Sequence, residues 1–197
     1  MKTIHWAFVI VLLLRAGAVG AAFTGAYSPA NWTITNTDGG GSITSSSESV
    51  ALTSSNLGIG SFSNVDFTIV APSSGQVSFD WAYLTLDING SFLDPFGLLR
   101  QGSFAQLTTD TFIPGSQSGS VSFFVNVGET FGFSQLSLDG KKGAATSTIT
   151  NFSASAPVPE PNALMLMLGG ILGLLLFRIR RTLIGAVSPV LRAQLGY

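Results

Sequence analysis

The side chains of this 197-residue chain that could bind a ligand gather between residues 80 and 97. They combine carboxylate and amide oxygens with one aromatic ring, and the candidates are Asp80, Asp87, Asn89, Asp94 and Phe96. Such oxygens are the ligands that calcium prefers, and an aromatic ring beside them can bind the face of a sugar. The segment therefore predicts either a structural calcium site at Asp87 and Asp94 or a sugar-binding surface.

The same segment has the composition of ordinary turns. Asp before Asn-Gly or Pro is frequent in turns, and the stretch Asp94-Pro95-Phe96-Gly97 could present its ring from such a turn. The spacing around Asp87 lacks the earlier and later ligands of the helical calcium loop. Turn, sugar-binding surface and calcium site therefore remain three open hypotheses for this segment.

Composition excludes most hydrolase and zinc chemistry. Cysteine is absent, and the only histidine, His5, lies close to the N-terminus. The rest of the chain therefore cannot form a Ser-His-Asp or Cys-His arrangement, nor a histidine or cysteine zinc site. Paired carboxylates could still hydrolyse a glycoside, and those available are Asp80, Asp87, Asp94, Asp110, Glu129 and Asp139. We expect a protein that is not an enzyme and that has no cofactor, apart from the calcium already considered.

The elements that must position these groups are β-strands. From Gln76 to Tyr83, apolar side chains alternate with polar or small ones, which is typical of a half-buried strand. Beyond this run the apolar residues Leu84, Leu86 and Ile88 occupy the other parity. We therefore predict a bulge or bend there, followed by a second short strand.

Further alternating segments indicate an all-β domain. Residues 121–127 alternate cleanly, and Gly128-Glu129 predicts a turn into Phe131 and Phe133, so we expect a hairpin. Weaker strand candidates are residues 31–36, 49–52, 65–70, 102–108 and 146–154. The stretches 38–42 and 45–49 are rich in glycine and serine and predict a flexible loop.

This pattern predicts an antiparallel β-sandwich of jelly-roll type over residues 23–156. Without disulfides, such a domain depends on core burial alone. We expect aromatic side chains to supply most of that core, namely Trp32, Phe67, Phe79, Trp81, Phe104, Phe123, Phe131, Phe133 and Phe152.

The N-terminal segment has the features of a secretory signal peptide. Lys2 supplies a positive charge, Trp6 to Leu14 form an apolar core, and small residues follow at 16–22. We predict that residues 1–22 are removed and that the mature chain begins at Phe23.

Charge is distributed unevenly along the chain. All ten acidic residues lie between Asp38 and Glu160, and the same stretch holds three basic residues, Arg100, Lys141 and Lys142, for a formal charge of −7. An acidic domain without a basic patch argues against nucleic acid as a partner. Neutral sugars, cations and protein surfaces remain open.

The C-terminal region changes character at two prolines. Pro159 and Pro161 cannot continue a helix interior or a strand ladder, and an apolar run from Ala163 to Phe177 follows them. This run is shorter than the roughly 20 residues of an ordinary spanning helix, but the arginine stems beyond it can extend toward the headgroups. We predict one marginal transmembrane helix, with a buried core helix of a globular domain as the alternative. A transmembrane helix here could also be an ordinary single-pass anchor after a proline linker.

In this order, the three elements resemble the PEP-CTERM sorting signal of Gram-negative bacteria. Pro159, Glu160 and Pro161 match its box, residues 163–177 match its helix, and the basic cluster is matched by Arg178, Arg180 and Arg181. The resemblance covers residues 157–181 and is followed by a tail, 182–197, of unknown role. It implies recognition by exosortase, a membrane-embedded cysteine peptidase, with processing near the box.

Together these features predict an exported, non-enzymatic surface or matrix protein. We expect it to be sorted to the cell envelope or the extracellular matrix, with a structural or adhesive role in exopolysaccharide or biofilm. Its expected partners are exosortase, the membrane and exopolysaccharide. The alternatives are a carbohydrate-binding module for the host's own polymer and a glycan-active enzyme.

Overall fold

Alternating apolar side chains build the two strands at the centre of the fold. Strand β4 (Ser63–Val70) and strand β5 (Gly75–Thr85) each bury every second side chain, so each strand has one buried face. The two strands lie in different sheets, and the short link between them leads from one sheet to the other. This arrangement places the apolar faces of two sheets against each other.

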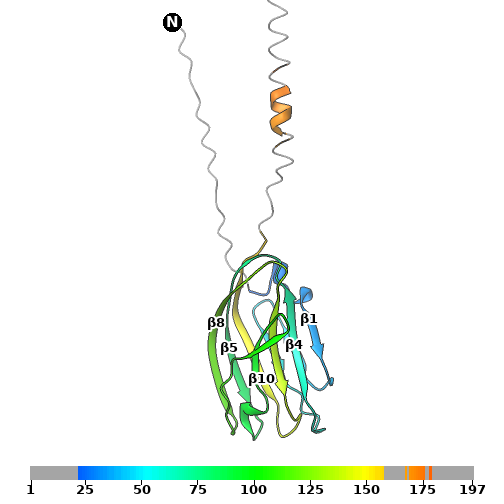
Figure 1. Ribbon diagram of the computed structural model, residues 1–197, viewed down its shortest axis with the longest axis vertical. Helices are drawn as coiled ribbons and strands as arrows, with labels where there is room; N and C mark the ends of the chain where they lie inside the picture. The colour runs from blue at the N-terminus through cyan, green and yellow to red at the C-terminus, as the bar shows by residue number, and fades with distance from the viewer. Residues whose placement is uncertain (1–21, 158–166, 168, 176–177, 179–197) are drawn as a thin grey trace, which may run out of the picture. The chain divides into compact units, whose positions relative to one another are not determined.

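The computed structural model describes residues 22–157, 167, 169–175 and 178 (Figure 1). The chain divides into two units, Met1–Pro157 and Val158–Tyr197. The described part of the first unit is a sandwich of two five-stranded antiparallel sheets, with strand orders β1-β4-β9-β6-β7 and β2-β3-β10-β5-β8. We call them the first and the second sheet.

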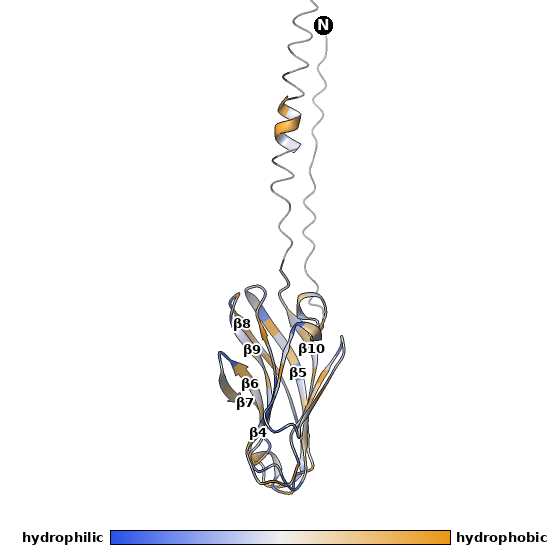
Figure 2. Ribbon diagram, turned by 90° about the vertical axis from the view of Figure 1, so that its right-hand side faces the viewer, coloured by the Kyte–Doolittle hydropathy of each residue, from blue (hydrophilic) through white to orange (hydrophobic). Residues whose placement is uncertain are grey.

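The other strands are β1 (Thr33–Asn36), β2 (Ser42–Ser45), β3 (Val50–Thr53), β6 (Phe96–Arg100), β7 (Ser103–Gln106), β8 (Gly115–Val125), β9 (Thr130–Ser137) and β10 (Ala145–Ala154). Three short 3₁₀ helices complete the sandwich, η1 (Gly25–Tyr27), η2 (Pro29–Asn31) and η3 (Gly90–Phe92). The predicted antiparallel sandwich is confirmed. Polar and apolar residues alternate along its strands (Figure 2).

Aromatic rings fill the core at one end of the sandwich. The Trp32 indole stacks on Phe67 with ring centres 4.5 Å apart, and Phe23 stacks on Phe152 at 4.6 Å. Most predicted core aromatics are buried, whereas Phe123 is only partly buried and Phe104 lies outside the core cluster. The prediction missed four buried rings, Phe23, Tyr27, Tyr83 and Phe96.

Two local predictions about the strands are wrong. Residues 121–127 and 131–133 do not form a hairpin, because β8 pairs with β5 in the second sheet and β9 pairs with β4 and β6 in the first. The turn between them crosses from one sheet to the other. The strand at 76–83 also continues without a bend to Thr85, and Leu84 and Leu86 remain on the exposed side.

Two strands were not predicted. The glycine- and serine-rich stretch that was expected to be a loop contains β2, which pairs with β3 through residues 42–45. The expected turn at 94–97 leads directly into β6, which begins at Phe96. In both cases pairing with a neighbouring strand overrides weak local preference.

The two ends of the sandwich differ. Residues 22 and 157 lie at the same end (Figure 1), where the Tyr27 hydroxyl donates a hydrogen bond of 3.2 Å to the Ser155 carbonyl. The opposite end, here called the distal end, consists of the loops 37–41, 54–62, 86–95, 107–114 and 138–144. Backbone hydrogen bonds join these loops, for example Gly58 N to Gly140 O at 2.7 Å and Leu138 N to Leu93 O at 2.7 Å.

In the second unit, residues 167, 169–175 and 178 are helical. Within the described part of the chain, the structure contains no helix with the length and apolar character needed to cross a membrane. The other residues of the predicted span 163–177 lie outside the described residues, as do residues 1–21 of the predicted signal peptide 1–22 and the tail at 182–197.

Candidate functional site

The structure separates the predicted ligand residues into three environments. Phe96 is fully buried in β6, so the prediction that it presents its ring to a ligand is wrong. Asp80 lies on the outer face of β5 in the second sheet. Asp87, Asn89 and Asp94 lie together in the distal loop 86–95.

Asp87 points inward because the alternation of buried and exposed side chains along β5 continues beyond the end of the strand. Thr85 and Asp87 continue the buried series of β5, while Leu86 and Ile88 are 67% and 60% exposed. The Asp87 carboxylate is fully buried and accepts a hydrogen bond of 2.5 Å from the backbone N–H of Asn89 through Oδ1. Its Oδ2 atom has no hydrogen-bond partner.

Asp94 is also fully buried, and neither carboxylate oxygen has a hydrogen-bond partner. Its backbone is held firmly: the Asp94 carbonyl accepts hydrogen bonds of 2.9 Å from the Tyr83 hydroxyl and 2.9 Å from Gln135 Nε2. Gln135 in turn accepts a bond of 2.6 Å from Ser147. Strands β5, β9 and β10 therefore fix the position from which this carboxylate enters the interior.

Burial perturbs both carboxylates. Together with smaller contributions from the nearby charges of Asp87 and Asp139, it raises the pKa of Asp94 to about 7. The hydroxyls of Ser137 and Ser54 oppose this rise, although neither makes a hydrogen bond of normal geometry with the carboxylate. Burial likewise raises the pKa of Asp87. Ionising both groups without a counter-charge is unfavourable in such an interior.

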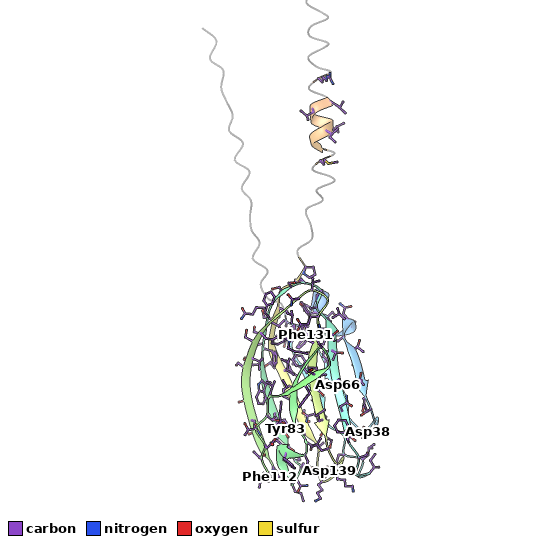
Figure 3. All side chains as sticks on the ribbon, in the orientation of Figure 1. Asp38, Asp66, Tyr83, Phe112, Phe131 and Asp139 are labelled. Atoms are coloured by element: carbon purple, nitrogen blue, oxygen red, sulfur yellow. The ribbon has the colours of Figure 1, made fainter. Side chains whose placement is uncertain are left out.

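Unpaired polar atoms are concentrated at this end of the sandwich. Within the described residues, six buried side-chain oxygens have no hydrogen-bond partner, and all six belong to the distal end: Asp38 Oδ2, Ser55 Oγ, Ser63 Oγ, Asp87 Oδ2 and both carboxylate oxygens of Asp94. Buried polar groups are normally satisfied, so this concentration requires a physical explanation. Figure 3 shows Asp38, Tyr83 and Asp139 in the half of the sandwich that contains this end.

Asp80 occupies a different kind of site. Its Oδ2 accepts a hydrogen bond of 2.7 Å from Asn151 on β10, and its Oδ1 accepts one from the Ser120 hydroxyl on β8. These bonds, with Asn151 first, lower the pKa of Asp80 and keep it ionised at neutral pH. Asn151 has a left-handed φ of 50° at a register shift between Thr150 and Ser153. Asn151 and Ser120 were not predicted as partners of Asp80, because only the register of the strands brings them to it.

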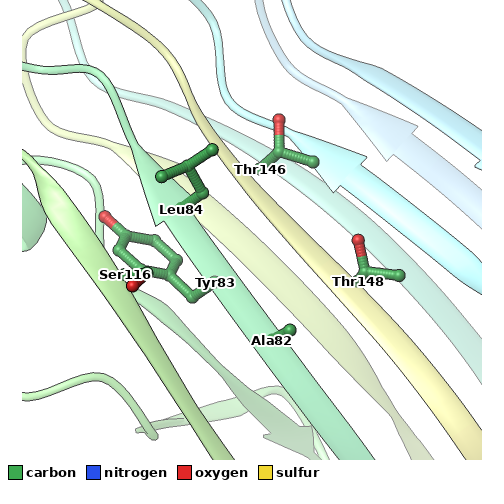
Figure 4. Close-up of a pocket in the computed structure, with 6 residues that line it drawn as sticks. All are labelled: Ala82, Tyr83, Leu84, Ser116, Thr146 and Thr148. Atoms are coloured by element: carbon green, nitrogen blue, oxygen red, sulfur yellow. The ribbon is translucent and has the colours of Figure 1, made fainter.

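A pocket lies further along the same outer face (Figure 4). Its lining comes from β5, β8 and β10, and consists of Ala82, Tyr83, Leu84, Ser116, Thr146 and Thr148. Leu84 is half exposed there, whereas the Tyr83 ring is buried on the other side of the strand. The pocket thus offers hydroxyl groups and a small apolar surface, and its lining includes no charged side chain.

A metal centre of three or more acidic, histidine or cysteine side chains is absent from the described residues. The predicted calcium residues Asp87 and Asp94 both lie at the distal end. Asn89 contacts Asp87 through its backbone N–H. A sugar-binding aromatic platform is not formed by Phe96 or by Trp81, which is 7% exposed.

The predicted sorting residues Pro159, Glu160, Pro161, Arg180 and Arg181 lie outside the described residues. Arg178 is described and is helical. The last strand of the sandwich, β10, ends at Ala154, three residues before the segment that contains the box. The boundary between the two units falls at Pro157, just before this box.

Solved structures show only remote likeness to the chain. A family 35 carbohydrate-binding module from Clostridium thermocellum is 12% identical, with 61% of this chain and 92% of that chain covered and a TM-score of 0.32. The N-terminal cellulose-binding domain of Cellulomonas fimi β-1,4-glucanase C is 12% identical, with 66% and 91% covered and a TM-score of 0.33. The Eiger TNF of S. frugiperda is 14% identical, with 48% and 69% covered and a TM-score of 0.22. Likeness of this degree carries no argument about a ligand.

No curated protein matches the chain. The PEP-CTERM protein-sorting motif, however, matches residues 157–181. These are the residues over which the sequence resembled the PEP-CTERM sorting signal, so that resemblance is confirmed. The motif implies processing by exosortase, export, and sorting to the cell envelope or extracellular space. With this motif directly after its β-sandwich, the chain is a PEP-CTERM protein.

Proposed function

We propose that the β-sandwich is a non-enzymatic cargo that exosortase processes near Pro159-Glu160-Pro161 and that acts as a structural or adhesive component of the envelope or the extracellular matrix. The sorting motif at residues 157–181 carries this proposal. In it, residues 1–22 serve as the signal peptide and residues 163–177 as a transmembrane helix until processing occurs.

The construction of the sandwich supports processing at that point. Strand β10 ends at Ala154, and the Ser155 carbonyl accepts hydrogen bonds from Tyr27 and Ser73. Cleavage near the box therefore removes no strand and no core side chain. The folded domain can then persist in the matrix after it leaves the membrane.

The distal end suits contact with other molecules. Of the 14 large apolar side chains that are exposed in the described sandwich, nine lie in its loops: Leu57, Ile59, Phe62, Leu86, Ile88, Phe92, Phe112, Ile113 and Leu138. Exposed apolar surface of this kind is typical of interaction sites. It favours an adhesive role over that of an inert spacer.

The carboxylates support a non-enzymatic role. A glycosidase needs two carboxylates that flank an accessible bond. Asp87 and Asp94 are fully buried, and Glu129 is engaged by Arg100 in an ion pair. Asp80 is exposed to solvent only partly and is tied to Asn151 and Ser120. No two of these four carboxylates form a free acid–base pair in a cleft.

Strand order supports assigning the sandwich to the jelly-roll type. Eight strands follow the order β3-β10-β5-β8 in one sheet and β4-β9-β6-β7 in the other, and β1 and β2 extend the two edges. Two interlocked four-stranded sheets of this kind are the basis of a jelly roll. Jelly rolls frequently present one sheet face or one loop end to a partner.

A second candidate function is binding of the host's exopolysaccharide on the outer face of the second sheet. The hydrogen-bonded group of Asp80, Asn151 and Ser120 favours it, because ionised carboxylates and amides can bind sugar hydroxyls. Replacing Asp80 by alanine is then expected to weaken retention on isolated matrix. Asp66 is the matched control, since it is held by Ser134 and Asn64 on the outer face of the first sheet.

The sorting proposal is tested by deleting residues 159–161 in the native host. We expect export to continue, with a larger product that stays in the membrane fraction. The double substitution P157A/N162A, which flanks the box, is the control and should be processed normally. Unchanged electrophoretic mobility and localisation of the deletion variant would refute the proposal, whatever the outcome of the matrix-binding assay.

A further inference from the structure

We propose that Asp87 and Asp94 bind a calcium ion at the distal end of the sandwich. Such an ion would hold the distal loops in place, which is a role separate from sorting and matrix binding. The ligands would be carboxylate oxygens that are buried in the interior and lack hydrogen-bond partners.

The buried carboxylate oxygens require a counter-charge or a proton. Both residues are 0% exposed, and three of their four carboxylate oxygens have no hydrogen-bond partner. An unpaired polar atom in the interior is costly, and an unpaired charge costs more. A cation between the two side chains would remove this cost for both groups at once.

A single loop carries both residues into the interior at the distal end. Asp87 comes directly after β5, Asp94 comes just before β6, and η3 lies between them. In addition to burial, the charges of Asp87 and Asp139 raise the pKa of Asp94, whereas Asp139 raises and Lys142 lowers the pKa of Asp87. The carboxylate oxygens of Asp87 and Asp94 that have no hydrogen-bond partner are of the type that a hard cation prefers as ligands.

Hydroxyl oxygens can complete such a site. Ser54 Oγ accepts a hydrogen bond of 2.9 Å from the Ala145 N–H, and Ser137 Oγ accepts one of 3.0 Å from the Gly140 N–H. Both hydroxyls also lower the pKa of Asp94, as expected of groups close to its carboxylate. Calcium accepts six to eight oxygen ligands and tolerates irregular shells that combine carboxylates with neutral oxygens.

The ligand set favours weak binding of calcium over magnesium. Only two carboxylates are buried, and no group of three acidic side chains is close enough to be a strong centre within the described residues. Affinity falls with the number of charged ligands, so we expect a Kd of about 10⁻⁴–10⁻³ M, which is the range of extracellular calcium modules. Magnesium demands a nearly octahedral shell and gives up water reluctantly.

Terbium luminescence provides a direct test. Tb³⁺ replaces calcium in oxygen sites and emits when a nearby aromatic side chain transfers excitation to it, and the Tyr83 hydroxyl lies 2.9 Å from the Asp94 carbonyl. The full chain, purified in detergent, is titrated with Tb³⁺ and then with calcium. We expect sensitised emission that millimolar calcium displaces and that equimolar magnesium does not.

Thermal unfolding supplies the second readout. At 10 mM calcium, a Kd in the expected range raises the unfolding midpoint by about 5–10 °C. Asp94→Asn and Asp87→Asn keep the side-chain shape, and each is expected to abolish at least nine-tenths of this shift and of the terbium signal. Asp80→Asn, on the outer face, is the control and should retain both.

The results decide the proposal in either direction. Calcium-dependent shifts that are lost in Asp94→Asn and Asp87→Asn and kept in Asp80→Asn support it. If 10 mM calcium leaves the wild-type midpoint unchanged, or if both distal variants retain the shift, the proposal is wrong and the interior holds Asp94 as a neutral acid. Circular dichroism of each variant identifies one that fails to fold, in which case the other distal variant decides.

Discussion

Replacing Phe23 by alanine tests where the mature chain must begin. Phe23 is the first core residue after the predicted signal peptide and is 1% exposed. Its ring lies 4.6 Å from the Phe152 ring, 5.8 Å from Trp32 and 6.4 Å from Phe67, measured between ring centres. A signal peptidase that cut after Phe23 would remove this ring as effectively as the substitution does.

The expected cost follows from the loss of a buried ring. Truncating a core phenylalanine to alanine costs about 3–5 kcal/mol, which includes about 0.5–1.5 kcal/mol for each favourable aromatic pair. Domains of this size unfold with about 5–15 kcal/mol. Phe23→Ala should therefore remove a large fraction of the total stability while leaving most of the domain folded in the absence of denaturant.

Urea unfolding of the purified protein, followed by tryptophan fluorescence, measures this cost. With a denaturant dependence of about 2 kcal/mol per molar urea, the midpoint should fall by about 2 M. Phe124, which is 57% exposed on β8, is the control, and Phe124→Ala should shift the midpoint by less than about 0.5 M. Equal midpoints for the two variants would refute the assignment of Phe23 to the core and with it the requirement that the mature chain retain this residue.

Two further substitutions test the packing and the electrostatics of the sandwich. Arg100, and then the Asn126 N–H, lower the pKa of Glu129 from its ordinary value of 4.5, so the stabilisation that this carboxylate provides is present above pH 4.5 and is lost as the pH falls through the lowered pKa. Glu129→Gln should therefore flatten the decline of the urea midpoint between pH 5 and pH 3, and an unchanged slope would contradict this. A Cβ at Gly132 would lie 2.2 Å from the Phe67 carbonyl oxygen and 2.7 Å from Thr68 Cα, so Gly132→Ala should cost about 1–3 kcal/mol of unfolding free energy. Gly115→Ala, which meets no atom within 4 Å, is its control, and equal unfolding free energies for the two would show that the strands have more room than the structure indicates.

The strands were predictable where their pattern is local. Alternation located β4, β5 and β10 closely, because an apolar face every second residue is itself the signal for a half-buried strand. It failed after Tyr83, where Leu84 and Leu86 are more hydrophobic than Thr85 and Asp87 but lie on the exposed side. Hydrophobicity therefore gave the wrong parity at a place where polar side chains face the interior.

The candidate sites were predictable only in part. Asp87 and Asp94 were named from their chemistry, yet their burial and their unpaired oxygens depend on loops that are distant in sequence. Asp80 acquires Asn151 and Ser120 as partners through the register of three strands. Phe96 was assigned to a turn because Asp-Pro precedes it, whereas pairing with β7 and β9 draws it into the core.

By itself the sequence determined that this chain carries an export and sorting device, since the box, apolar run and basic cluster are read in linear order and match at residues 157–181. It also determined that the domain before this device is built from strands. Only the tertiary structure decided which strands are neighbours, placing β8 and β9 in opposite sheets, and which acidic side chains face inward. The physical reason is that alternation is a property of one strand, whereas pairing and burial depend on partners that lie tens of residues away.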